Sequence, residues 1–293
     1  MPGITVRIGD GVSAFGETDD AGAFALMVPV EPRKPRLAAE KRRGAGDAVS
    51  ALDAVYILQH LVGARSLSED QVLACDTTGD GVVTALDAAR VLDLAVGDIE
   101  RLPVMRACDS DWLFRVATGA REDRVLSCDN PSVEIDGAAP ALEVVALLPG
   151  DCTGNWTSPA SASKRLVAPR RSRARVRVGR LRLRGKRALL PVYIRSPSPY
   201  NSIDMDVAYD FTALRPQGVH LRGQRGDPIV QMSSKGADGF VRLAIASAEP
   251  LNRGRRQLVV LEFEVLTDGL ASSPTLVTLK IDEQSPRLSQ FKD

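Results

Sequence analysis

The sequence predicts a multidomain protein of α and β structure. We expect a small helical unit with paired metal-binding loops, a C-terminal antiparallel β-sandwich of the jelly-roll type, and a short N-terminal β fragment. Two observations predict this class: a loop-helix pattern recurs after 34 residues, and short alternating strands follow one another over about the last 120 residues. A chain of 293 residues has room for two or three domains.

The N-terminal segment, residues 1–34, predicts part of a small β module. Residues 4–8 alternate as a strand, and a turn at residues 18–22 precedes a second strand pattern at residues 23–28. The tract T-D-x-x-G-x-F at residues 18–24 resembles the carboxypeptidase-regulatory-like β-sandwich. Thirty residues cannot bury a complete sandwich core, so we interpret this segment as a partial domain followed by a proline-marked linker.

A loop-helix segment then occurs twice. Residues 49–63 and 83–97 share eight identities in fifteen positions, including the tract Val-Ser/Thr-Ala-Leu-Asp-Ala. Apolar residues continue at helical spacing in both copies, and a glycine ends each pattern. Because each helix has one apolar face, we expect the two helices to pack against each other within a unit that spans residues 38–103.

The second copy begins with a tract that has the spacing of a calcium-binding loop. Calcium takes six to eight oxygen ligands, which such a loop presents at alternating positions around a sharp turn. Gly81 stands where the chain must turn. The expected ligands are Asp76, Thr78, Asp80, the Val82 carbonyl, Thr84 and Asp87. The alternative is a glycine-rich surface turn that carries acids.

The first copy has a weaker set of ligands. Its loop positions 1, 3 and 5 are an arginine and two glycines, which offer no carboxylate. The residues of this loop that could supply oxygens are Asp47, Ser50 and Asp53. We therefore expect this site to be weak or empty, and Asp53 to cap its helix.

On these residues, the segment 38–103 resembles the type I dockerin domain of cellulosomal and related secreted proteins. The resemblance implies calcium as the ligand, a cohesin-like protein partner, and an extracellular or cell-surface location. It also implies that loop positions 10 and 11 help to contact the partner, and these are Ala51, Leu52, Ala85 and Leu86. The alternative, that these small apolar residues only pack the start of each helix, stays open.

Residues 104–157 predict a β-rich extension linked by disulfides. The four cysteines allow three pairings, and none lies in a C-x-x-C motif. Cys108 and Cys128 would close a loop of about twenty residues, and Cys75 with Cys152 would tie the extension to the repeat. Four reduced thiols are the alternative. Near the end of this segment, Asp151 and Asn155 could hold a second ion or cap a turn, and we favour the turn.

A basic stretch separates this extension from the C-terminal strands. Residues 161–187 hold twelve Lys and Arg and no acid, whereas the whole chain has a net charge of only +1. Nucleic-acid binding is one interpretation. The arginines, however, alternate with apolar residues as on one face of a strand, and no aromatic residue is present to stack bases. We therefore predict a basic linker at residues 158–170, a solvated strand face after it, and no nucleic-acid partner.

Residues 171–293 predict an antiparallel β-sandwich. Strand patterns occur at residues 188–194, 203–209, 240–246, 258–265 and 275–281. The tracts at residues 190–194, 204–210, 239–244 and 261–265 resemble cohesin domains and the similar carbohydrate-binding modules. Most aromatic residues fall at strand or core positions rather than in an exposed strip, which favours protein recognition over glycan binding.

The chain lacks the usual signs of an enzyme. It has only two histidines, and no G-x-S-x-G, Walker, H-E-x-x-H or dinucleotide-binding motif. The sequence has no stretch of membrane-spanning length and no signal peptide, and we interpret its start as a domain fragment or a misplaced start codon. We therefore expect a non-catalytic secreted protein for calcium-dependent assembly with a cohesin- or dockerin-like module. The alternative is a carbohydrate-binding accessory module of an extracellular polysaccharide-degrading system.

Overall fold

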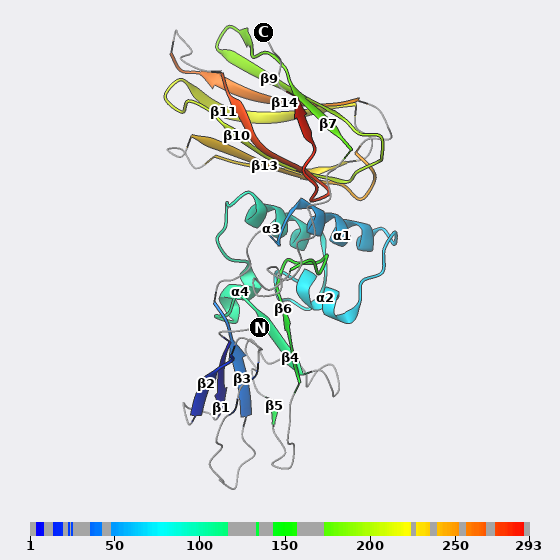
Figure 1. Ribbon diagram of the computed structural model, residues 1–293, viewed down its shortest axis with the longest axis vertical. Coiled ribbons are helices and arrows are strands. Elements are labelled where there is room, and N and C mark those ends of the chain that lie inside the picture. The colour runs from blue at the N-terminus through cyan, green and yellow to red at the C-terminus, as the bar shows by residue number, and fades with distance from the viewer. Residues whose placement is uncertain are drawn as a thin grey trace. The chain divides into compact units, whose positions relative to one another are not determined.

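The computed structural model, whose helices and strands are labelled in Figure 1, divides into two compact units by its internal contacts. Unit 1 comprises residues 1–48, 67–83 and 101–166, and unit 2 comprises residues 49–66, 84–100 and 167–293. The residues that the structure describes are 4–8, 14–19, 23, 25, 36–42, 48–116, 133–134, 143–156, 173–223, 227–234, 239–251, 256–267 and 273–289.

Unit 2 contains a β-sandwich of two facing sheets. A four-stranded sheet has the order β12-β13-β10-β15, and a six-stranded sheet has the order β11-β14-β9-β7-β16 with β8 paired to β9. All pairs are antiparallel except β16 with β7. The strands are β7 (Arg175–Val178), β8 (Arg182–Arg184), β9 (Arg187–Arg195), β10 (Ser202–Ala208), β11 (Leu214–Arg222), β12 (Ile229–Ser233), β13 (Phe240–Ala246), β14 (Arg256–Val265), β15 (Thr275–Ile281) and β16 (Arg287–Ser289). The predicted fold class is confirmed.

Alternation of apolar residues builds the sandwich core. In β10, Ile203, Met205 and Val207 are buried in the cluster between the sheets. In β7, Val176 is buried whereas Arg175 and Arg177 are exposed. Residues 175–178 of the basic stretch thus have the solvated face that their period of two predicted, whereas in β8 Leu183 is exposed together with Arg182 and Arg184, so the apolar face expected there is not buried.

The strand predictions were most accurate where apolar alternation is regular. β13 and β15 have the predicted bounds, and β9, β10 and β14 differ from theirs by one or two residues. The sequence did not predict β11 or β12. Strand β11 contains Pro216 and Gly218, which are both disfavoured in strands and which flank a register shift against β14.

Unit 2 also contains the two repeat helices, α1 (Ala51–Leu61) and α3 (Ala85–Ala95), which pack against each other. Gly63 and Gly97 follow their ends with φ values of 71° and 77°, as predicted for glycines that terminate helices. Ala54, Ile57, Ala88, Val91 and Leu92 are fully buried. The buried face of α1 includes fewer residues than its apolar sequence pattern, because Leu61 at the end of the helix is 44% exposed.

Unit 1 combines two small sheets with two short helices. A four-stranded sheet has the order β2-β1-β3-β5, and β4 pairs with β6. The elements are β1 (Thr5–Ile8), β2 (Ala14–Glu17), β3 (Arg36–Glu40), α2 (Glu69–Cys75), α4 (Pro103–Ala107), β4 (Leu113–Val116), β5 (Val133–Glu134) and β6 (Val144–Leu147). Trp112 is buried and meets Trp156 edge to face, with ring centroids 4.7 Å apart. Because β5 pairs with β3, the N-terminal strands share a sheet with residues from the extension.

The boundaries of the two compact units differ from the domain ranges expected from the sequence. Those domain ranges are not tested by this division and stay a prediction. Helices α1 and α3 group with the sandwich, whereas α2 groups with the extension. The linker at residues 158–170 lies outside the described residues, as do residues 24 and 26–28 of the second N-terminal strand pattern. No helix in the described ranges is long and apolar enough to cross a membrane.

Candidate functional site

The first part of the predicted calcium loop, residues 76–82 in unit 1, folds around the Asp76 carboxylate. Its Oδ1 accepts hydrogen bonds from the Thr78 hydroxyl at 3.2 Å and from the amides of Gly79 and Asp80 at 2.8 and 3.2 Å. Its Oδ2 accepts from the Gly81 amide at 2.8 Å. Gly79 and Gly81 have φ values of 78° and 88°, so both turns require residues that tolerate the left-handed region.

Helix α4 supports this part of the loop. The Val104 amide donates to the Thr77 carbonyl at 3.0 Å, and Thr77 is fully buried. A Cβ at position 79 would lie 3.1 Å from Val104 Cγ2, so there is little room for a side chain. The sequence did not predict α4, because a five-residue helix is too short to show a period.

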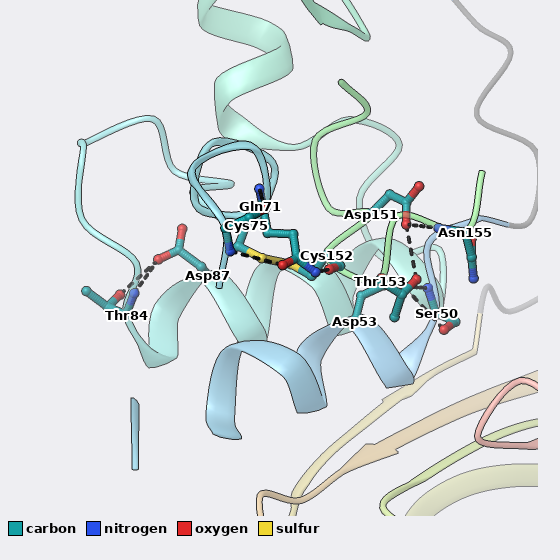
Figure 2. Close-up of a disulfide and its surroundings, with 11 residues drawn as sticks. Ser50, Asp53, Gln71, Cys75, Thr84, Asp87, Asp151, Cys152, Thr153 and Asn155 are labelled. Carbon is teal, nitrogen blue, oxygen red and sulfur yellow. Dashed lines mark hydrogen bonds between the residues drawn. A yellow bond between two sulfur atoms is a disulfide. The ribbon is translucent and has the colours of Figure 1, made fainter. Parts of the chain in front are cut away.

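The last part of the loop, residues 84–87 in unit 2, forms the start of α3. The Thr84 hydroxyl accepts from the Leu86 amide, and Asp87 Oδ2 accepts from the Thr84 amide at 2.8 Å (Figure 2). This reciprocal arrangement is a capping box. Asp87 is fully buried, so the loop's last acid is fixed by its helix.

These residues fit a calcium ion by their chemistry. Every predicted ligand offers oxygen, which calcium prefers. Thr84 stands at loop position 9, which often coordinates calcium through a water molecule. Val82 is held in place by its amide, which donates to Asp80 Oδ1 at 2.9 Å. Within the described ranges, no group of three or more His, Cys, Asp or Glu could hold a metal by itself. Hydroxyl and carbonyl oxygens of the loop would therefore have to complete the ligand set.

The first repeat has the same helix start. Ser50 caps α1, and Asp53, fully buried, accepts from the Ser50 amide at 2.8 Å (Figure 2). Asp53 therefore stabilises the helix from its third residue and acts together with Ser50, rather than as the cap residue itself. Arg42 at loop position 1 pairs with Asp109. Asp47 lies outside the described residues.

A disulfide joins Cys75, immediately before the calcium loop, to Cys152 (Figure 2). Their Cα atoms are 5.2 Å apart and both residues are fully buried. Two hydrogen bonds reinforce this junction: Gln71 Nε2 donates to the Cys152 carbonyl at 2.8 Å, and the Gly150 amide donates to the Ala74 carbonyl at 2.7 Å. Cys128, the predicted partner of Cys108, lies outside the described residues.

The turn at residues 151–156 shares three hydrogen bonds with the start of the calcium loop. Asp151 accepts from the Thr153 hydroxyl, the Asn155 amide and the Trp156 amide at 3.0–3.1 Å. These donors stand two, four and five residues after the aspartate, as Thr78, Asp80 and Gly81 do after Asp76. Asp151 therefore orders a turn in the way that we favoured from the sequence. The shared tract D-x-T-G-D/N was the signal in the sequence for this likeness.

The predicted partner-binding residues differ between the two repeats. Ala51 is fully buried and Leu52 half-buried, whereas Ala85 and Leu86 are exposed, Leu86 by 50%. The Ala51 amide donates to Asp204 Oδ1 on β10 at 3.0 Å. The start of α1 therefore contacts the sandwich within unit 2, and the equivalent start of α3 stays accessible there.

Asp204 sits in an environment that disfavours its ionised form. Burial raises the pKa of Asp204 to about 6; the Ala51 amide and Lys280 act in the opposite direction, while Glu283 and Asp206 add to the increase. Its Oδ2 is buried and has no hydrogen-bond partner among the described residues. Asp204 therefore keeps its proton up to a higher pH than an exposed aspartate does.

We expect unit 2 to lose stability as the pH rises from about 4 to about 6. Because the folded pKa of Asp204 is raised, its contribution is fully present below the unfolded pKa and is lost as pH passes the folded pKa. A difference of about 2 between the folded and unfolded pKa of Asp204 corresponds to about 3 kcal/mol in the free energy of unfolding. Thermal unfolding of the full chain between pH 4 and about pH 7 measures this effect. This loss of stability with rising pH should be absent in Asp204→Asn and persist in Asp206→Asn. Identical pH profiles for wild type and Asp204→Asn would contradict the attribution of the loss to Asp204.

Residues 46–93 match the family model of the dockerin type I domain. Among solved structures, the chain is similar to a non-cellulosomal cohesin from the archaeon Archaeoglobus fulgidus, with 20% identity over 41% of this chain and 86% of that chain, and a TM-score of 0.32. It is also similar to the second type II cohesin module of the ScaA scaffoldin of Acetivibrio cellulolyticus, with 17% identity over 41% and 94%, and a TM-score of 0.31.

A third similar structure is the sixth cohesin of scaffoldin B from Acetivibrio cellulolyticus, in complex with a dockerin mutant. The identity is 13% over 40% of this chain and 94% of that chain, and the TM-score is 0.31. No curated protein matches the chain. The recognition of a dockerin type I domain, made from the loop spacing and the repeated Val-Ser/Thr-Ala-Leu-Asp-Ala tract, is confirmed by the family match at residues 46–93.

Proposed function

We propose that this protein is a non-catalytic, extracellular assembly protein whose dockerin-type repeat binds calcium and a protein partner. The observation that carries the proposal is the fold of residues 76–82 within the matched dockerin range. There, a single carboxylate orders the turn and an oxygen-only ligand series follows at calcium-loop spacing.

The proposed ligands for one tight site are Asp76, Thr78, Asp80, the Val82 carbonyl, Thr84 and Asp87. Calcium bound there would neutralise the loop carboxylates, whose mutual repulsion otherwise opposes folding. The loop's own contribution is orientation: the Asp76 hydrogen bonds set the turn, and the capping box fixes Asp87 at the start of α3. A second site at Asp47, Ser50 and Asp53 would be weak, because positions 1, 3 and 5 of that loop are Arg42, Gly44 and Gly46, which offer no carboxylate.

The partner class is tested by titration calorimetry of the full chain, with calcium and with a chelator. The probes are purified cohesin modules, purified dockerin modules, cellulose and chitin. We expect calcium-dependent binding to a protein module and no binding to either polysaccharide. Binding to polysaccharide alone, or the same protein binding in the presence of chelator, would overturn the proposal.

A glycan-binding role is the second candidate, and one observation favours it. Phe211 and Phe240 are 47% and 39% exposed at one end of the sandwich, where Phe240 pairs with Ala208 across the strands. Exposed aromatic rings can stack on sugar rings. If this role were correct, Phe211→Ala and Phe240→Ala would each weaken retention on cellulose or chitin. Tyr200 and Phe263 are fully buried and are not candidates.

A further inference from the structure

We propose that the sheet β12-β13-β10-β15 is the partner of this chain's own α1–α3 helix pair, so that the recognition contact is made in cis. An external partner of either surface would then have to displace this contact. The inference names a partner for the helix pair and in that sense rests on the proposed assembly function. The contact itself lies wholly within unit 2 and is argued from its residues.

The outer face of β13 is covered where the helices lie. Val241, Leu243 and Ile245 point into the sandwich core, so the residues between them point outward. Ala244 and Ala246 on this outer face are only 1% and 0% exposed. Further along the same face, Phe240 and Arg242 are exposed. The contacts within unit 2 place α1 beside β10 and β13, and α3 beside β12 and β13. The helices therefore exclude water from the part of the sheet with the smallest side chains.

Polar residues on both sides of this alanine surface bond to the helical segments. The strand register places Asp204 of β10 and Gln231 of β12 on either side of Ala244. Asp204 accepts the Ala51 amide at the start of α1, and Gln231 Nε2 donates to Asp98 Oδ2, just after α3, at 2.9 Å. Each repeat is thus anchored to a different strand.

Two further bonds extend the contact along α1. At its start, the Ser50 hydroxyl donates to Glu283 Oε1 at 2.8 Å. Near its end, Gln59 Nε2 donates to the Ala248 carbonyl at 3.4 Å. Both ends of the helix are therefore attached to segments that leave the same sheet, β15 and β13.

The turn that carries Glu283 has an unusual backbone. Asp282 and Glu283 have φ values of 45° and 61°, which non-glycine residues seldom adopt. The Asp282 carboxylate holds this turn by accepting from the amides of Asn201 and Ser202 at 3.0 and 2.9 Å. A conformation of this kind persists only where its surroundings fix it, and here it presents Glu283 to the start of α1.

The contact uses one repeat differently from the other. The two helix starts share sequence and capping geometry, but Ala51 is buried against the sandwich and Ala85 is exposed. Because the two surfaces belong to one chain, the contact forms without the loss of translational freedom that a separate partner incurs. We therefore infer that the full chain is a closed monomer.

Hydrogen exchange of the full chain in calcium, followed by mass spectrometry, tests this inference with two matched pairs of variants. Ala51→Arg places a charge in the contact, and Ala85→Arg places the same charge at the equivalent exposed position. Asp204→Ala removes the acceptor for α1, and Asp206→Ala removes the next outward-facing acid of β10, which bonds Thr278. Asp204→Ala changes no residue of either helix, so this variant remains informative if Ala51→Arg does not fold.

We expect Ala51→Arg and Asp204→Ala to accelerate exchange in α1, β10 and β13 by more than about tenfold, and the two controls to leave it unchanged. Wild-type protection should be independent of protein concentration, with a monomer in sedimentation. Equal exchange in all four variants, or protection that is lost on dilution of a dimer, would overturn the cis contact. Because a closed cis contact would itself compete with an external partner, the proposed function is tested separately in Asp204→Ala, where the α1 anchor is removed. Failure of that variant to bind a cohesin or dockerin module in calcium would overturn the proposed function and leave the exchange result standing.

Discussion

Replacing Cys75 and Cys152 together by serine should lower the free energy of unfolding of unit 1 by roughly 4 kcal/mol. The bridge joins residues 77 positions apart. In the chain-entropy model, closing a loop of that size restricts the unfolded chain by an amount between about 3 kcal/mol for 15 residues and about 4.7 kcal/mol for 100 residues. Both sulfurs belong to fully buried residues, so the new hydroxyls add a smaller cost.

Tryptophan fluorescence in urea measures this change in unit 1, because both tryptophans, Trp112 and Trp156, belong to it. Ala74→Ser is a control for the buried hydroxyl, since Ala74 is 4% exposed and stands beside Cys75. A loss no greater than that of Ala74→Ser would show that the bridge does not stabilise this unit.

Asp76→Ala should remove the order of the calcium loop and lower its calcium affinity by more than about 100-fold. Residues in the outer shell of metal sites already change affinity by about 10–100-fold, and Asp76 is a proposed direct ligand. The same carboxylate accepts the amides of Gly79, Asp80 and Gly81, so these amides lose their acceptor as well.

Calcium titration and amide exchange of residues 79–81 measure the two consequences separately. Asp93→Ala is the control, because Asp93 lies on α3 outside the loop and forms an ion pair with Arg90. Unchanged calcium affinity in Asp76→Ala would place the ion elsewhere in the chain. Unchanged exchange with lost affinity would assign Asp76 to ligation alone.

Local sequence spacing predicted most of the helical repeat. The apolar spacing of both helices and the glycines that end them act over one or two turns, so their pattern is visible in the chain. The capping roles of Ser50 and Thr84 were not predicted, because the loop spacing marked both as oxygen ligands and the α1 cap was assigned to Asp53. Helix α2 was missed although Ser68 and Gln71 form a capping box, because seven residues show too little apolar periodicity.

The asymmetry between the repeats could not be predicted from the repeats themselves. Ala51 and Ala85 occupy equivalent positions in nearly identical tracts, and what distinguishes them is Asp204, 153 residues after Ala51. The burial of Ala244 and Ala246 also results from contacts between distant segments, because the alternation of side chains along β13 alone would place both on a solvent-exposed face. Contacts between distant segments, rather than local propensity, decide which copy of the repeat is covered.

The most direct test of the account is calorimetric titration of calcium into the unmodified full chain after metal has been removed with a chelator. We predict one tight site per chain, at residues 76–87, and at most a weak second site, with thermal stability rising as the first site fills. Two equally tight sites, or no binding, would contradict it.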